Sequence, residues 1–186
     1  MAMAAIVPRY TAEEVRAFPD HRVRYEVIRG ELFVTPAPGL QHQRTVLALA
    51  RLLLDYLERT GLGEVVMAPF EVELTEDSAV QPDVLVILAD QASRLTPKRL
   101  MGAPSLAVEV ISYTSKRTDR LQKRQLYQEE RVPEYWVVDP ELRRVERWRP
   151  GDVSPEVLTE RLMWRPGAEA PALEIDLVAL FERVWR

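Results

Sequence analysis

Two apolar segments in the middle of the chain constrain the fold most strongly. Residues 84–88 read Val-Leu-Val-Ile-Leu, and residues 106–111 read Leu-Ala-Val-Glu-Val-Ile. Apolar runs that do not alternate with polar residues are typical of central strands buried on both faces of a sheet. Glu109 interrupts the second run, and a buried carboxylate is costly unless it is paired or binds a cation. We therefore expect these strands to carry a functional site.

Asp83 is the second acid of this candidate site, because it directly precedes the first apolar run. If the two strands are neighbours, Asp83 and Glu109 converge where strand ends meet the adjoining loops. Two convergent carboxylates can hold Mg²⁺ (or Mn²⁺), which neutralises charge on a phosphodiester and lowers the pKa of a bound water. In the alternative interpretation, Asp83 is a turn residue after Pro82 and Glu109 pairs with an arginine.

A polar helix is expected from about residue 115 to residue 130, with Asp119, Lys123 and Tyr127 on one face. A lysine beside a metal can polarise the attacking water or balance transition-state charge. The alternative is an exposed Asp119–Lys123 pair, which contributes at most about 0.5 kcal/mol. Further basic residues could follow a nucleic-acid backbone, although a solvated helix face explains them as well; they are Lys116, Arg117, Arg120 and Arg124.

Three further residues are weaker candidates for supporting roles. Gln81 could hydrogen-bond a ligand water, or it is simply an amide at the edge of a strand. His42 stands at the start of the longest predicted helix, where anions are favoured, but a lone histidine there is more often structural. Glu31 could be a third acid near the metal, or a charge at a hairpin.

Composition limits the functional classes. The chain has 186 residues, no cysteine and a net charge of −4. The absence of cysteine excludes disulfides, thiolate metal sites and cysteine nucleophiles, and the net charge argues against a protein that coats nucleic acid by bulk electrostatics. We find neither an apolar run of about 18 residues nor a signal peptide, so the sequence predicts a cytoplasmic protein that does not cross a membrane.

The pattern of elements predicts a single α/β domain with a mixed β-sheet flanked by helices. Its expected parts are an N-terminal helix and hairpin over 10–36, a core over 40–140, and C-terminal strands and a helix over 141–186. Besides the polar helix from about residue 115, we expect four helices: one opening at Thr11, one over 40–60, one around 96–100 and a last one capped by Asp176. The further expected strands cover 23–28, 31–35, 64–74, 143–149 and 156–162. Pro69 interrupts the third of these strands, and the fourth is expected at a sheet edge.

Short motifs in a fixed order along residues 10–150 resemble a known family. They are Tyr25-Glu26, Gly30-Glu31, His42, Pro82-Asp83, Val108-Glu109-Val110, Ser112, Asp119-x3-Lys123-x3-Tyr127 and Glu134-Tyr135-Trp136-Val137-Val138-Asp139. This order is similar to that of the Uma-two family, restriction-endonuclease-like nucleases of the PD-(D/E)xK superfamily. The resemblance implies a restriction-endonuclease-like core, a Mg²⁺-dependent nuclease site that acts on DNA, and frequently a homodimer.

The resemblance assigns Asp83 as the first acid of the motif and Glu109 as the second. The motif lysine should stand two residues after Glu109, where this chain has Ile111, so the resemblance implies that the lysine has moved to Lys123. Our first hypothesis is a Mg²⁺-dependent DNA endonuclease. The alternative is a non-catalytic nucleic-acid-binding or assembly module on a decayed nuclease fold, which Ile111 and the acidic composition favour. Hydrolysis of another phosphodiester is a third option.

Overall fold

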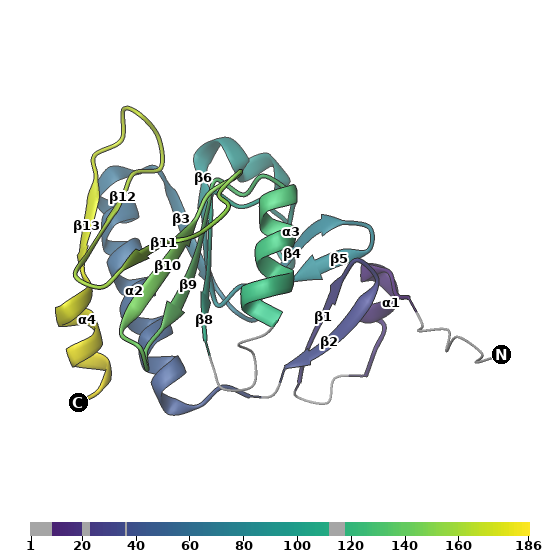
Figure 1. The fold of residues 1–186 in the computed structure, drawn as a ribbon. Helices are drawn as coiled ribbons and strands as arrows, with labels where there is room; N and C mark the ends of the chain where they lie inside the picture. Colours follow the sequence, from purple (N-terminus) through teal and green to yellow (C-terminus); the bar gives the residue numbers. More distant parts are fainter. Residues whose placement is uncertain (1–8, 20–22, 36, 112–117) are drawn as a thin grey trace.

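A computed structural model describes residues 9–19, 23–35, 37–111 and 118–186, with residues 118–120 described by their backbone alone. Two large β-sheets and a small two-stranded sheet make up the strand structure, and helices cover the sheets (Figure 1). The predicted α/β class with a mixed sheet flanked by helices is confirmed.

The six-stranded sheet contains the two apolar segments that dominate the sequence. Its order is β11 (Glu156–Leu158), β10 (Arg144–Trp148), β9 (Glu134–Asp139), β8 (Leu106–Val110), β6 (Val84–Leu88) and β3 (Gly63–Met67). Strands β8 and β9 run parallel, and the other neighbouring pairs are antiparallel, so the sheet is mixed. Strands β6 and β8 are neighbours, so the condition under which Asp83 and Glu109 are expected to converge is met.

Both faces of the central strands are buried, as their unbroken apolar sequences predict. Helix α2 (Leu40–Thr60) covers one face with an apolar stripe that includes Leu49, Leu53 and Leu57. On the other face, Leu126 and Tyr127 of α3 (Arg124–Glu129) pack in the cluster that contains residues of β6, β8 and β9. Burial at about 25 cal/mol per Å² of apolar surface drives this layering.

The five-stranded sheet lies beside the central sheet and is formed largely by the N-terminal half of the chain. Its order is β2 (Glu31–Thr35), β1 (Arg24–Ile28), β5 (Ser78–Val80), β4 (Glu71–Thr75) and β7 (Arg99–Met101). Helix α1 (Ala12–Arg16) opens with the predicted capping box at Thr11. The chain passes from β5 directly into β6, so Asp83 stands at the junction of the two sheets.

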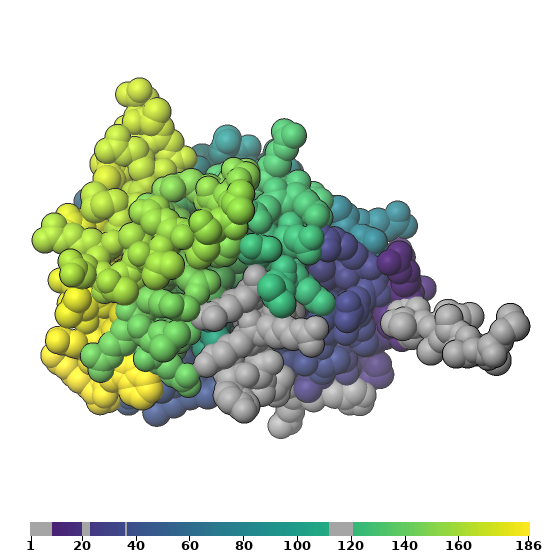
Figure 2. All heavy atoms as spheres, in the orientation of Figure 1, coloured from purple at the N-terminus to yellow at the C-terminus, as the bar shows by residue number. Residues whose placement is uncertain are grey.

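The C-terminal segment packs on the α2 side of the central sheet. Strands β12 (Arg161–Trp164) and β13 (Leu173–Asp176) form a hairpin, and α4 (Leu177–Val184) follows it. The Asp176 side chain accepts a hydrogen bond from the Ala179 amide, which confirms the predicted cap. In the space-filling view this segment lies at the opposite end of the molecule from α1, β1 and β2 (Figure 2).

Strand register explains why the two acids converge. Val84 is paired with Val108 in the antiparallel β6–β8 ladder, so the next step of the register brings Asp83 opposite Glu109. Residues directly opposite in an antiparallel pair project on the same face of the sheet. The Glu109 side chain contacts Lys123 and Tyr127 on the side covered by α3, whereas Asp83, which precedes the ladder, also contacts His42 of α2.

Several expected elements differ from the structure. In place of a helix around 96–100, the chain forms a 3₁₀-helix over Ala89–Arg94 and then β7, because Thr96 closes a turn with Arg99 through its side chain. The expected strands over 64–74 and 156–162 each divide between two sheets, and β10 is not an edge strand because β11 covers it. The expected helix from about residue 115 is a π-helix over Thr118–Lys123 that continues into α3; its first residues lie outside the described part of the chain.

We predict that Gly63→Ala destabilises the protein by about 2–3 kcal/mol. A β-carbon at this position would lie 2.2 Å from the Ile87 carbonyl oxygen, and relieving such overpacking requires the backbone to move. Urea denaturation measures the effect. Gly167→Ala is the control, since its β-carbon meets nothing within 4 Å; equal stability of the two variants would contradict the prediction.

Candidate functional site

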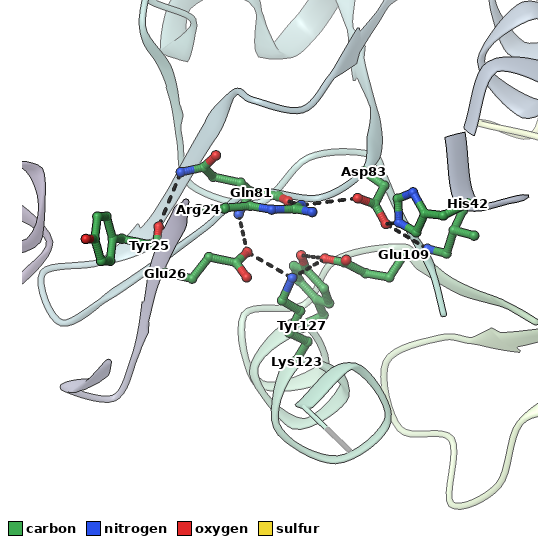
Figure 3. Close-up of polar contacts among 10 residues, drawn as sticks. Arg24, Tyr25, Glu26, His42, Gln81, Asp83, Glu109, Lys123 and Tyr127 are labelled. Carbon is green, nitrogen blue, oxygen red and sulfur yellow. Dashed lines mark hydrogen bonds and ion pairs between the residues drawn. The ribbon is translucent and has the colours of Figure 1, made fainter. Parts of the chain in front are cut away.

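A buried cluster of charged side chains lies where the two sheets and α3 meet (Figure 3). Its acids are Glu26 on β1, Asp83 before β6 and Glu109 on β8, and each is at most 3% exposed. Arg24, His42 and Lys123 contact these carboxylates. Buried charges require such partners because the protein interior solvates ions poorly.

Lys123 joins the two sheets through an ion-pair bridge. Its Nζ atom lies 2.7 Å from Oε1 of Glu109 and 2.8 Å from Oε1 of Glu26. The Lys123 residue is only 1% exposed. The alternative of an exposed Asp119–Lys123 pair is therefore wrong for Lys123, whose ammonium lies beside Glu109, the second acid of the candidate site.

Asp83 is held by three donors. Its Oδ1 accepts from Nη1 of Arg24 at 3.1 Å, and its Oδ2 lies 3.0 Å from Nε2 of His42 and 2.9 Å from the amide nitrogen of Val110. The β6–β8 ladder ends at Val84 and Val108, so the Val110 amide on that side is available to the Asp83 side chain. The end of the β6–β8 ladder thus leaves a backbone donor that holds the Asp83 carboxylate in place.

Electrostatics keep Asp83 ionised. Burial alone would raise its pKa, but the hydrogen bond and charge of His42, together with the charges of Arg24 and Lys123, outweigh burial and lower the pKa below 3.8. Burial and the nearby Glu109 carboxylate raise the pKa of Tyr127 well above 10. The Tyr127 hydroxyl therefore stays protonated at neutral pH, and it donates to Oε1 of Glu109 over 3.3 Å.

Arg24 and Glu26 belong to the cluster although no role was predicted for them from the sequence. Both belong to β1 and are two residues apart, so they share one face of the strand. Gln81 connects to them through its backbone: its amide donates to Glu26 over 2.6 Å, and its carbonyl accepts from Arg24 over 2.7 Å. The sequence does contain a signal for Glu26, which is an acid directly before apolar Val27 and Ile28 in a predicted strand. Glu109 is likewise an acid within a predicted apolar strand.

Other sequence candidates lie elsewhere. Glu31 is exposed at the hairpin turn and lines a separate hollow of about 370 Å³. The Arg124 guanidinium stacks over Trp148, with 4.8 Å between its central carbon and the ring centroid. Lys116 and Arg117 lie outside the described residues, as do the side chains of Asp119 and Arg120.

A cavity of about 480 Å³ adjoins the Asp83 end of the cluster. Arg24, His42 and Asp83 line its polar side, and most of its remaining wall is apolar. Glu109 and Lys123 are not among the lining residues. The cluster therefore has one end open to a ligand-sized space and another end enclosed beneath α3.

The described residues contain no preformed group of three or more histidine and acidic side chains that could hold a metal ion. The ligand type still suits Mg²⁺ or Mn²⁺. In phosphate-processing sites Mg²⁺ is usually held by one or two carboxylates, and water and substrate oxygens complete its coordination shell. Asp83, directly before β6, and Glu109, on β8, are the two acids that could supply such carboxylates. No helix in the described part of the chain is long and apolar enough to cross a membrane.

Comparison with known proteins identifies the class. A profile of the Uma2 family, described as "Putative restriction endonuclease", matches residues 12–177, and the chain belongs to this family. The fold is similar to the crystal structure of "a putative nuclease belonging to DUF820" from Anabaena variabilis, with a TM-score of 0.78, 17% identity, and coverage of 94% of this chain and 99% of that one. No curated protein matches the sequence. Family and fold together support a restriction-endonuclease-like nuclease.

We predict that Lys123→Met lowers the free energy of unfolding by about 3–5 kcal/mol, because it leaves two buried carboxylates without their shared cation. Adding Glu26→Gln and Glu109→Gln should restore most of the loss, since the side chains at positions 26, 109 and 123 are then all neutral. Urea denaturation measures both effects. Lys98→Met, at an exposed position, is the control and should change stability by less than about 0.5 kcal/mol.

Asp83 should also make stability depend on acid. Because its folded-state pKa lies below the usual 3.8, its ion pairs stabilise the fold fully above pH 3.8, and this contribution declines as the pH falls through the folded-state pKa. The stability difference between wild type and Asp83→Asn should therefore shrink below pH 3.8 in urea titrations without metal. Asp90→Asn, at an exposed position, is the control. A difference between wild type and Asp83→Asn that stays constant down to pH 2.5 would contradict the assignment.

Proposed function

We propose that the protein is a metal-dependent endonuclease that hydrolyses DNA phosphodiester bonds. Asp83 and Glu109 would hold Mg²⁺ or Mn²⁺, and Lys123 would act beside them. One observation carries the proposal: Asp83 directly precedes β6 and, by extension of the β6–β8 register, lies opposite Glu109 on β8, whose carboxylate is 2.7 Å from the Lys123 ammonium. The family and the fold support the same class of reaction.

The metal, when bound, would supply Lewis-acid stabilisation of the phosphoryl oxygens and a water of lowered pKa. The chain's own residues would perform the remaining tasks. Lys123 is placed to orient a water or to balance charge that develops on the phosphate. Tyr127 and Glu26 hold the Glu109–Lys123 pair in place, while His42 and the Val110 amide orient Asp83.

Position 111 supports a displaced lysine. Ile111 is 4% exposed and packs in the apolar cluster between the sheet and α3. Lys123 reaches the Glu109 carboxylate from the helical segment instead. A lysine from a different element can thus supply the charge that the strand position lacks.

The alternative is a nucleic-acid-binding or assembly module without catalysis. Asp83 favours this alternative, because both of its oxygens already accept hydrogen bonds from protein groups. A bound metal would have to displace at least one of these donors. A homodimer is a further expectation from the family resemblance, and light scattering in solution would test it.

We expect wild-type protein to nick supercoiled plasmid or cut single-stranded circular DNA with Mg²⁺ or Mn²⁺, and not with EDTA. Glu109→Gln and Lys123→Ala should each reduce the cleavage rate at least about 100-fold, as loss of a transition-state contact typically does. Glu31→Gln, which changes an exposed acid away from the cluster, should cleave at the wild-type rate. Thermal melting confirms that each variant is folded.

Two results would favour the binding module. One is the absence of cleavage by wild type under all metal conditions together with no heat on titrating Mn²⁺ into the protein. The other is DNA binding that Glu109→Gln leaves unchanged while wild type never cuts. Cleavage that survives Glu109→Gln in full would remove Glu109 from the site.

A further inference from the structure

The cavity beside Asp83 has the dimensions and the lining of a small-ligand site. Its volume of about 480 Å³ lies within the range of roughly 300–1,000 Å³ that is usual for such sites. Val23, Val46, Ala68 and Pro69 form much of its apolar wall. Arg24 and His42 stand with Asp83 on the polar side, so an apolar surface and a charged surface face the same space.

Arg24 has unused hydrogen-bonding capacity at this cavity. Both of its hydrogen bonds come from Nη1, and its other guanidinium nitrogens donate to no residue in the described part of the chain. His42 lies beside it on the lining, where its Nε2 contacts Asp83. A guanidinium with free donors suits a phosphate.

Burial of the acids limits which substrate can reach them. Asp83 is 3% exposed and Glu109 is 2% exposed, so the site lies below the protein surface. An intact duplex keeps its bases stacked inside, and enzymes that need access to one nucleotide unstack it into a pocket. A cavity of this size admits one nucleotide and is too small for a base pair within a helix.

We propose that this cavity binds one unpaired nucleotide of the substrate strand, which makes single-stranded or locally unpaired DNA the substrate class. Arg24 contacts the phosphate, and the base packs against Val46 and Pro69. The role of the bound nucleotide as a substrate rests on the proposed nuclease function. Binding of the nucleotide requires only the cavity.

The test measures binding in EDTA, where no cleavage takes place. Fluorescence anisotropy compares a labelled 15-nucleotide single strand with the blunt duplex of the same sequence, and thymidine 5′-monophosphate competes with the single strand. Ala37→Trp fills the cavity from an exposed position on its lining. Ala168→Trp places the same side chain on the exposed β12–β13 loop, at the far end of the molecule from β1 and β2 (Figure 2).

Wild type should bind the single strand at least tenfold more tightly than the duplex, and the monophosphate should compete. Ala37→Trp and Arg24→Gln should each weaken single-strand binding at least tenfold, whereas Ala168→Trp should stay within twofold of wild type. Equal affinity for the two DNA forms, or wild-type binding by Ala37→Trp, would overturn the proposal. Thermal melting ensures that both tryptophan variants are folded.

The test separates this proposal from the nuclease assignment. Selective single-strand binding without cleavage under any metal condition would retain the cavity and reject the nuclease. Metal-dependent duplex cleavage that Ala37→Trp leaves intact would retain the nuclease and reject the cavity as a nucleotide site.

Discussion

The ion-pair bridge of Lys123 with Glu26 and Glu109 is the interaction on which the site depends. Its three charges come from β1, β8 and the helical segment before α3, so the bridge connects the five-stranded sheet, the central sheet and their covering helix. Each charge is almost fully buried. Such a cluster is stable only when its partners are all present, and this requirement fixes the relative positions of the three elements.

The surrounding core makes this geometry rigid. Strands β6, β8 and β9 are apolar on both faces, and α2 and α3 cover them from opposite sides. Close packing leaves the acids little freedom to separate. The cluster is asymmetric: the Asp83 end opens to the cavity, while the Glu109–Lys123 end is enclosed. In the function proposed above, a substrate that enters from the cavity would meet Asp83 first, with Arg24 and His42 beside it.

Much of the fold could be predicted from local patterns. The sequence predicts the bounds of α2 and the helix starts at Thr11 and Asp176, because helix termini depend on nearby residues. Which sheet each strand joins could not be predicted from the sequence. Residues 64–74 and 156–162 each separate into strands of different sheets, since strand pairing depends on partners distant in sequence.

For the candidate site, the sequence by itself predicted the two acids and the lysine, and the structure brings them into one buried cluster. A carboxylate within an otherwise apolar strand needs a partner, and this energetic requirement can be recognised from the sequence alone. Only the tertiary structure decided which partners they have. Glu26 and Arg24 come from a strand more than fifty residues before Asp83, and no local pattern could bring them to Lys123 and Asp83. The physical reason is that burial, which makes these contacts strong, arises only when distant segments pack together.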